Sequence, residues 1–488
     1  MDNRATSARV ARADHVHRLA AELGDWTVGT GPLFRRLARA LAAAVDRGTL
    51  APGARLPSER ALAAATWSSR GTAVAAYDLL VGDGVIERRR GSGTFVSDPG
   101  RGAPPAGLPA DREGTALLAR LVGTGTGPAA GSPQVIDLSI AVLHDAPGLP
   151  DVAVTSTELS APAGGDDPWG LEELRAAVAR RLTAQGLPST STQVVITTGA
   201  QQAIHIAAAC WIRPGDRVVV EDPTYPGAIA AFRAAGAELV GVPVDDRGVD
   251  VEALERAVSE RPALAYLQSA GHNPTGTVLA DHRRRRVAEL LARTRVPLVE
   301  DVALAGLLAS DQAPPGLIAG AIDGHPAVVV GSFSKELWSG LRVGFARAPG
   351  PVAGRLARIK ATQDLGSSAA GQLLTARLLE HPDTPAFLAR RNAGLEQRRT
   401  VLTEHLRTHL PEWRWDEPAA GLSLWVRLPS ADAERVAHLA LRHGVAVATA
   451  EGLAPAGGHP DRLRLSFALP EPLLAEGVAR LAAAWSGR

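Results

Sequence analysis

Cysteine, lysine and tyrosine are all scarce in this chain of 488 residues. The single cysteine, Cys210, excludes a disulfide scaffold and a cysteine-based zinc site, and we expect no metal. The sequence has no run of 18 apolar residues, so no transmembrane helix is expected. Its first residues, MDNRATSARVARADHVHR, lack the apolar core of a secretion signal, and we therefore expect a cytoplasmic protein.

The few lysines and tyrosines are the first residues to inspect for a site. Only two of the 52 basic residues are lysines, Lys335 and Lys360, and the three tyrosines are Tyr77, Tyr225 and Tyr266. Arginine cannot replace lysine in a reaction that needs a neutral amine, because a guanidinium does not lose its proton near neutral pH.

The charge is distributed unevenly. Residues 1–100 contain 14 arginines and 10 acidic residues, a net charge of +4, whereas the rest of the chain carries −3. A positive excess at one end favours nucleic-acid binding there. Chance is the alternative explanation, since the asymmetry is modest.

The N-terminal part has the pattern of a winged helix-turn-helix. Residues 31–48 place leucines on one helical stripe, and Ser58 is a candidate N-cap for a short helix over 58–65. A second helix is predicted over 69–82, and two short strands around a Gly-Ser-Gly turn over 85–97.

The rest of the chain predicts a linker and an α/β domain. Residues 98–134 contain six prolines and eight glycines, which is typical of a linker. After residue 135, the apolar runs RVVVED, ALAYLQ, PLVED, AVVVGS and LRVGFA alternate with helical stretches, as in a mostly parallel sheet. We expect an N-terminal extension (1–28), a winged-helix domain (29–97), the linker (98–134) and a large C-terminal domain (135–488).

Three blocks in the first 100 residues resemble the GntR-type winged helix. They are Gly53-Ala-Arg-Leu-Pro-Ser-Glu-Arg60, Ser69-Arg70-Gly-Thr72 and Gly91-Ser-Gly-Thr-Phe-Val96. A recognition helix enters the major groove by its N-terminus, where arginine can bind phosphates or a guanine edge. The resemblance implies binding of double-stranded operator DNA through Arg60, Arg70, Gly71, Thr72 and Gly91.

One turn departs from that family. Thr66-Trp67-Ser68 stands where the family usually has Leu-Gly-Val, which could change the angle of the recognition helix. A winged helix used only for protein contacts is the alternative to DNA binding.

A second group of motifs indicates a phosphorylated aldehyde cofactor. Gly331-Ser-Phe-Ser-Lys335 closes an apolar run, and Arg342 follows seven residues later. A lysine at the end of a strand, flanked by hydroxyls and an arginine, suits a Schiff base with such an aldehyde. Ser332, Ser334 and Arg342 would then hold its phosphate.

Four further motifs fit the same cofactor, each at the carboxyl end of an apolar run, where open α/β sheets place ligands. Asp301 could pair with a protonated pyridine nitrogen, and the amide of Asn273 could bond the phenolic oxygen of the ring. Tyr225 offers a ring for stacking. The backbone amides of Gly199, Ala200 and Gln201 open an apolar helix and could bind phosphate.

This order of motifs resembles the fold-type I aminotransferases that use pyridoxal 5′-phosphate (PLP), over about residues 135–470. The whole chain resembles a MocR-type regulator, in which a GntR-like winged helix is fused to an aminotransferase-like domain. The resemblance implies a small C-terminal α+β subdomain, a homodimer, and Arg464 as the arginine that binds a substrate or effector carboxylate. Arg462 is a weaker candidate.

No tyrosine follows two or three residues after Asp301, which puts efficient catalysis in doubt.

Other residues receive structural interpretations. We expect Cys210, Tyr77 and His205 to be packed in cores. His272 is expected to be structural or solvated, with a cofactor contact left open. Arg283–Arg286 is expected to be a solvated helix face, with DNA contact as the alternative, and a phosphate contact of Arg88–Arg90 is left open.

Two functions are compatible with these motifs. The first is a DNA-binding regulator that binds PLP on Lys335 and senses PLP or an amino compound through aldimine formation. The second is a working PLP-dependent aminotransferase with a vestigial DNA-binding head.

Overall fold

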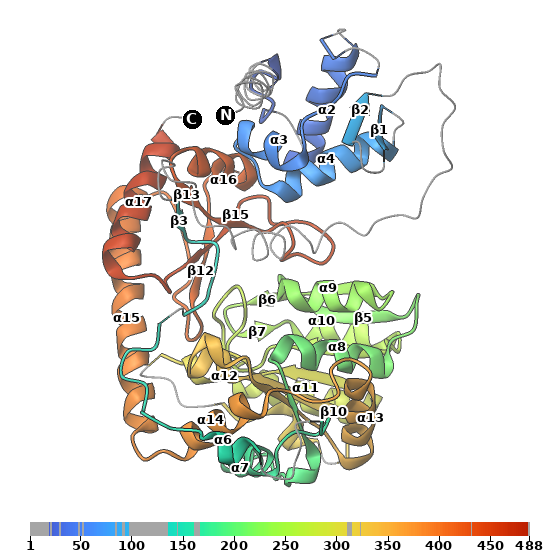
Figure 1. Ribbon diagram of the computed structural model, residues 1–488, viewed down its shortest axis with the longest axis vertical. Coiled ribbons are helices and arrows are strands. Elements are labelled where there is room, and N and C mark those ends of the chain that lie inside the picture. Colours follow the sequence, from blue (N-terminus) through green and yellow to red (C-terminus); the bar gives the residue numbers. More distant parts are fainter. Residues whose placement is uncertain are drawn as a thin grey trace.

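The structure is a computed structural model that describes residues 19, 22–28, 31–46, 49–50, 53–82, 85–89, 93–96, 135–143, 145–160, 166–309, 315–322, 324–430 and 432–486. Three parts follow one another along its longest axis (Figure 1). We call them the head (the described residues between 19 and 96), the small domain (residues 135–143 and 384–486, as described) and the large domain (residues 166–380, as described). The small domain lies between the other two.

Helices α2 (Leu33–Asp46), α3 (Glu59–Ala65) and α4 (Arg70–Gly82) and a hairpin follow one another in the head in winged helix-turn-helix order. In the hairpin, β1 (Ile86–Arg89) pairs antiparallel with β2 (Gly93–Val96). Ser58 caps α3, since its Oγ accepts from the amide of Ala61 at 3.2 Å. The helices pack around a core that contains Leu37, Leu62 and Tyr77. The predicted order of elements is confirmed.

The large domain is built on an eight-stranded sheet in the order β4-β11-β10-β9-β8-β5-β6-β7. Strands β10, β9, β8, β5 and β6 are parallel to their neighbours in that order, whereas β11 is antiparallel to both β10 and β4, and β7 is antiparallel to β6. The expected mostly parallel sheet is thereby confirmed. The strands are β4 (Val194–Thr197), β5 (Arg217–Asp222), β6 (Glu238–Asp245), β7 (Gly248–Val249), β8 (Leu264–Leu267), β9 (Leu298–Asp301), β10 (Ala327–Ser332) and β11 (Gly344–Arg347).

Helices cover both faces of this sheet, and alternate residues of each strand feed two separate cores. One core joins Val218, Val220 and Val299 to α8, α9 and α13, and the other joins Val219 and Ala265 to α7, α10, α11 and α14. Burial on both faces explains why the strands are uniformly apolar. The helices of this domain are α7 (Glu172–Ala184), α8 (Ala200–Trp211), α9 (Pro226–Ala234), α10 (Val251–Ser259), α11 (Asp281–Thr294), α12 (Phe333–Glu336), α13 (Gly350–Ala361) and α14 (Ala369–Glu380), with short 3₁₀ turns at Ser191–Gln193, Ala305–Leu307, Ile318–Ala321 and Ser339–Leu341. The short helix α6 (Ser156–Leu159) precedes the domain and has no buried residues.

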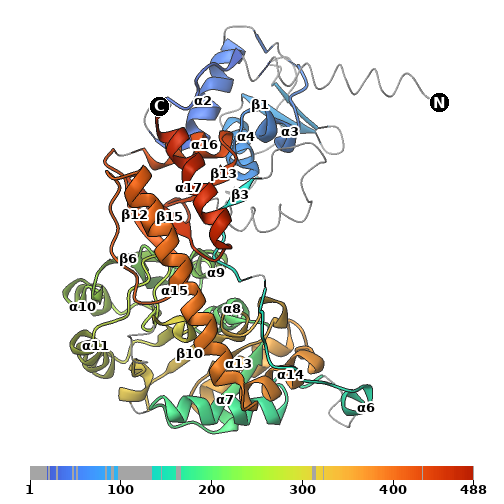
Figure 2. The same ribbon diagram turned by 90° about the vertical axis from the view of Figure 1, so that its left-hand side faces the viewer.

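The small domain is an α+β unit, as expected. The 26-residue helix α15 (Thr384–His409) runs from the large domain to the small one (Figure 2). Strands β12 (Ser423–Arg427), β15 (Arg462–Ser466) and β14 (Ala448–Thr449) form one sheet, and β3 (Ile136–Asp137) pairs with β13 (Val445–Ala446). Helices α16 (Ala433–Arg442) and α17 (Glu471–Ser486) complete it.

The structure corrects two structural interpretations. His205 is exposed rather than packed, because its position on α8 faces outward and its Nδ1 bonds the carbonyl of Gln201 at 2.8 Å. Arg284 is buried and donates to the carbonyl of Leu279, so Arg283–Arg286 is not a uniformly solvated face. Cys210 and Tyr77 are buried as expected.

The expected linker (98–134) lies outside the described residues, and the domain boundaries stay predictions. None of the helices in the described ranges is long and apolar enough to cross a membrane.

Candidate functional site

The sheet topology brings the predicted cofactor residues to one edge. Strands β4, β5, β8, β9 and β10 all run in the same direction, so their carboxyl ends meet there. The predicted residues follow these ends directly: Gly199, Ala200 and Gln201 after β4, Tyr225 after β5, Asn273 after β8, Asp301 at the end of β9, and Ser332, Ser334 and Lys335 at the end of β10.

Gly199, Ser332 and Arg342 surround one small space. A Cβ built on Gly199 would lie 3.9 Å from both Ser332 Oγ and Arg342 Nη2. Gly199 has φ +138° and directly precedes α8, whose first amides point toward the same space. The hydroxyl of Ser334 is buried and has no hydrogen-bond partner among the described residues. A phosphate would satisfy these groups, since helix N-termini and arginine both bind anions.

Lys335 presents its amine beside two arginines. Its Nζ donates to the carbonyl of Ala141 at 2.6 Å. Removal from water, and the nearby positive charges of Arg464 and Arg342, lower its pKa to about 8. A larger fraction of this amine is therefore neutral at pH 7 to 8 than of an exposed lysine, as attack on an aldehyde requires.

Asp301 is buried and holds two hydrogen bonds. Its Oδ2 accepts from the hydroxyl of Tyr266 at 2.6 Å, and its Oδ1 accepts from the amide of Ala303 at 2.8 Å. Burial raises the pKa of Asp301. A protonated pyridine nitrogen would compensate for this burial, because it supplies a positive charge next to the carboxylate.

Tyr225 and Gln201 lie together over Gly227. A Cβ on Gly227 would collide with the Tyr225 ring and with Gln201 Oε1, and Gln201 Nε2 donates to the carbonyl of Gly227 at 2.8 Å. Burial, and then the charge of Asp301, raise the pKa of Tyr225 to about 12. The hydroxyl of Tyr225 therefore stays neutral, and its ring offers a surface on which a flat cofactor can stack.

Arg464 lies on β15 and is 3% exposed. It donates to Asn273 Oδ1 at 3.0 Å and to the carbonyl of Ser139 at 2.5 Å, and its buried Nε has no partner among the described residues. The amide nitrogen of Asn273 is left to donate elsewhere. Burial lowers the pKa of Arg464 to about 10, so it stays charged at neutral pH.

His272 is buried rather than solvated. It is 2% exposed, its Nδ1 lies 2.8 Å from Thr275 Oγ1, and burial lowers its pKa to about 3. Its Nε2 is 3.7 Å from the carboxylate of Glu221, whose pKa burial raises to about 8. This neutral histidine supports the loop that presents Asn273.

Sequence reasoning gave no role to Tyr266, Ser139 or Ala141. Tyr266 is one of three tyrosines, and its scarcity was the signal that could have found it. Ser139 and Ala141 contribute backbone carbonyls from a loop about 190 residues before Lys335, and no side-chain pattern can reveal such contacts.

The predicted DNA-binding residues cluster on the head. Arg60 on α3 and Arg70 at the start of α4 are exposed, and Gly71 and Thr72 occupy the first turn of α4. Ser69 Oγ accepts from the amide of Thr72 at 2.9 Å and caps this helix. Gly91 lies outside the described residues. Arg88 is engaged within the head, where it pairs with Asp78 and Glu59.

The turn before α4 has an unusual backbone. Trp67 has φ +51°, in the left-handed region that favours glycine, and its side chain is 48% exposed. This is the position where the GntR pattern has glycine. The tryptophan therefore keeps the turn but adds a large ring beside the recognition helix.

Comparisons with known proteins identify both parts of the chain. Residues 154–481 match the family model for aminotransferase class I and II, and residues 33–96 match that for bacterial regulatory proteins of the gntR family. The HTH-type transcriptional regulator TauR of Rhodobacter capsulatus is 30% identical over 93% of this chain and 97% of its own.

Two further relatives match the aminotransferase-like part. The 2-aminoadipate transaminase of Thermus thermophilus is 34% identical over 63% of this chain and 79% of its own. The crystal structure of LysN, an alpha-aminoadipate aminotransferase of Thermus thermophilus complexed with N-(5′-phosphopyridoxyl)-L-leucine, covers 72% of this chain and 92% of its own at 29% identity, with a TM-score of 0.65. Together with the anion-binding groups around Gly199 and the lowered pKa of Lys335, these matches assign PLP as the cofactor. The chain belongs to the class I and II aminotransferase family and, through its DNA-binding gntR-family head, to the helix-turn-helix regulators that carry such a domain.

Proposed function

We propose that this protein is a transcriptional regulator whose head binds operator DNA and whose large domain senses PLP, or an amino compound, at Lys335. The observation that carries the proposal is the joining, in one chain, of a gntR-family head to a sheet edge with a single amine among anion-binding groups. The boundaries and site residues given above are part of the proposal.

Each residue at the edge has a distinct task. Ser332, Ser334, Arg342 and the first amides of α8 bind phosphate. Asp301 keeps a proton on the ring nitrogen, Asn273 donates to the phenolic oxygen, and the Tyr225 ring stacks. Lys335 would hold the cofactor covalently through its amine. When bound there, PLP supplies a carbon that amines can capture and a ring that withdraws electrons.

Arg464 gives the site a preference among amines. Its positive charge lies close enough to Lys335 to lower the pKa of that amine, and a guanidinium can pair with a carboxylate through two hydrogen bonds. We therefore propose amino acids, rather than simple amines, as the preferred effectors. A bound ligand changes DNA affinity only as far as it binds one arrangement of the domains better than another.

A homodimer is part of the proposal. Two heads related by twofold symmetry suit an operator with two half-sites. Light scattering of the purified protein with and without operator DNA tests this point directly, and a monomer in both samples would contradict it.

A mobility-shift titration tests the regulator. We expect specific binding to DNA from upstream of the gene, affinity that falls steeply with salt, and a change in affinity on adding PLP and amino acids. Lys335→Ala should keep DNA binding and lose the response. Absence of a specific complex at every salt concentration would refute the regulator.

Chemical labelling tests the lysine. Borohydride reduction of the protein mixed with PLP should fix a pyridoxyl group on Lys335, identified by peptide mass. Lys360 serves as an internal control, because it is fully buried and paired with Asp364. A label on other amines alone would contradict the assignment.

A working aminotransferase is the second candidate. It is favoured by the similarity to the 2-aminoadipate transaminase and by the presence of Lys335, Asp301, Asn273 and Arg464 at one site. Steady turnover of an amino acid with a keto acid, abolished by Lys335→Ala, would support it. Failure to convert PLP to its amine form with any amino acid would exclude it.

A further inference from the structure

The head lies on the small domain through the first turns of α16. Arg36 on α2 contacts both oxygens of Asp432, with Nη1–Oδ2 at 3.1 Å and Nη2–Oδ1 at 3.3 Å, and the Arg36 side chain is only 7% exposed. The backbone amide of Leu33, at the start of α2, donates to Glu434 Oε2 at 2.5 Å. Both carboxylates come from one end of α16, and the positive end of α2 points at them.

A second set of contacts lies beside the first. The ring of Trp26 meets His438 edge to face, with centroids 5.0 Å apart. Arg435 Nη1 donates to Thr27 Oγ1 at 3.1 Å, and its Nη2 is 3.5 Å from a carboxylate oxygen of Asp25. Four positions in the first turns of α16 thus hold the head.

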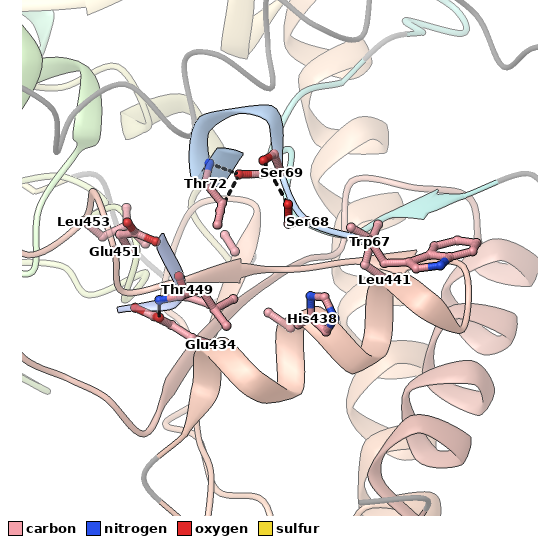
Figure 3. Close-up of a pocket in the computed structure, with 13 residues that line it drawn as sticks. Trp67, Ser68, Ser69, Thr72, Glu434, His438, Leu441, Thr449, Glu451 and Leu453 are labelled. Carbon is pink, nitrogen blue, oxygen red and sulfur yellow. Dashed lines mark hydrogen bonds between the residues drawn. The ribbon is translucent and has the colours of Figure 1, made fainter. Parts of the chain in front are cut away.

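This contact covers the end of the head that would read DNA. Ser68, Ser69 and Thr72, at the start of α4, line one side of a small cavity, and α16 lines the other with Glu434 and His438 (Figure 3). The cavity measures about 50 Å³ and is partly open to solvent, so the start of α4 and the face of α16 lie close together here. Ser69 and Thr72 are half-buried beside α16. A recognition helix must sink into a groove about 8.5 Å deep, and α16 stands where the wall of that groove would have to pass.

The floor of the cavity also connects to the cofactor edge. Thr449 and Leu453 line the cavity. Ala448, next to Thr449, pairs with Arg464 across the β14–β15 ladder, and the carbonyl of Leu453 accepts from the amide of Thr224 at 2.7 Å. Thr224 directly precedes Tyr225. Arg464 and Tyr225, which are proposed to contact the effector and the cofactor, are therefore linked through Ala448 and Thr224 to the cavity residues Thr449 and Leu453.

We propose that α16 and operator DNA compete for the same end of α4, so that the head reads DNA only after it leaves the small domain. This inference rests on the proposed DNA-binding function and adds its mode of control. In the docked arrangement Arg60 and Arg70 stay exposed, so nonspecific phosphate contacts persist while base reading is blocked. A ligand that moves β14 or the 450–454 loop changes the docked population and, with it, the apparent DNA affinity.

Asp432→Asn is the first test. Asparagine at this position can still cap α16 by accepting from the backbone amide of Arg435. It loses the negative charge that pairs with Arg36. If the head is docked for about nine-tenths of the time, its release tightens operator binding by about tenfold. Asp151→Asn is the matched control, since it removes the same charge from an exposed position outside the contact and should leave affinity unchanged. Equal affinities of Asp432→Asn and Asp151→Asn would overturn the proposal.

Cross-linking is the second test, and it works in the opposite direction. Ser68→Cys and Thr449→Cys place one cysteine on the head and one on the small domain, both lining the same cavity, and the one natural cysteine, Cys210, is buried. A short, reducible bis-maleimide should join the two new cysteines in the full chain and abolish specific operator binding, which reduction restores. A failure to cross-link, or a cross-linked protein that still binds its operator specifically, would overturn the proposal.

The two tests separate this inference from the proposed function. If the protein binds its operator specifically and neither Asp432→Asn nor the cross-link changes that binding, only the competition between α16 and DNA is refuted. If neither wild type nor the reduced double variant binds specifically, the regulator is refuted, and the competition with it.

Discussion

The chemistry of the site depends most on the charge state of one amine. Lys335 has a pKa of about 8, lowered by burial and then by Arg464 and Arg342, so half of the amine is neutral at about pH 8 and most of it one pH unit higher. We expect the rate of PLP capture to rise about tenfold per pH unit between about pH 6 and 7, to slow near pH 8 and to level off above about pH 9. The rise of the visible absorption band after mixing measures this rate. A rate that keeps climbing to pH 10 would mean an ordinary lysine.

Arg464 provides a second prediction for a single residue. Arg464→Gln removes the charge that would pair with a carboxylate, and it also removes the bond to Asn273. We expect PLP to bind, but amino acids to lose about tenfold or more in affinity, whereas amines without a carboxylate change little. Spectral titration with an amino acid and its decarboxylated amine measures both affinities.

Arg462→Gln is the matched control for this prediction. Arg462 lies two residues away on β15 and is paired with Asp461. The same charge is removed, so its affinities should stay as in wild type. Equal losses in both variants would indicate a general effect of charge and would contradict the role of Arg464.

At the scale of secondary-structure elements, a hydrogen bond inside the site joins the neighbouring strands β8 and β9. The hydroxyl of Tyr266 on β8 donates to Asp301 on β9, and both residues are buried. Tyr266→Phe leaves the carboxylate short of a donor, which should lower the free energy of unfolding of the large domain by about 1–3 kcal/mol and raise the pKa of Asp301 further. Thermal unfolding, and the pH at which bound PLP changes colour, measure the two effects.

Tyr77→Phe is the control for this variant. Tyr77 is also buried, and its hydroxyl donates to the carbonyl of Pro57 in the head at 2.9 Å. We expect it to destabilise the head and to leave the colour of bound PLP unchanged. A change in colour with Tyr77→Phe, or none with Tyr266→Phe, would show that Tyr266 has no particular link to Asp301 chemistry.

Elements formed by local pattern were predictable, and contacts between distant elements were not. The cap Ser58, the leucine stripe of α2 and the apolar runs of β5 and β10 are each set by neighbouring residues. The Tyr266–Asp301 bond joins residues 35 apart on adjacent strands. Nothing near either residue indicates which side chain faces which. The same holds for His205, which was expected to be packed because it lies in an apolar helix, whereas α8 places it on its exposed side.

For the whole molecule, the arrangement of the three parts was the least predictable feature. Arg36 and Asp432 are 396 residues apart, and in the sequence each looks like an ordinary charged surface residue. Motifs predicted what each part binds, because binding needs particular residue types at fixed spacing. Docking of one part on another depends on the shapes of two folded surfaces, which a sequence pattern does not reveal.

The cofactor should also act on the stability of the whole molecule, because its proposed ligands come from separate elements. Gly199 precedes α8, Asp301 ends β9, Ser332 ends β10 and Arg342 follows the Ser339–Leu341 turn, so one ligand would join four segments. At a PLP concentration 100 times its Kd, linkage gives about 2.7 kcal/mol of added stability, which corresponds to a rise of about 5 °C or more in the Tm of the large domain.

Two comparisons separate the phosphate contacts from the covalent bond in this effect. Lys335→Ala keeps the phosphate and ring contacts and should show a smaller rise in Tm than wild type. Pyridoxal, which lacks the phosphate, should give almost no rise with either protein, because Ser332, Ser334 and Arg342 then have no anion to bind. Differential scanning fluorimetry over a range of ligand concentrations measures all four values. Equal stabilisation by pyridoxal and PLP would place the ligand away from this edge of the sheet, since the groups gathered there are suited to a phosphate.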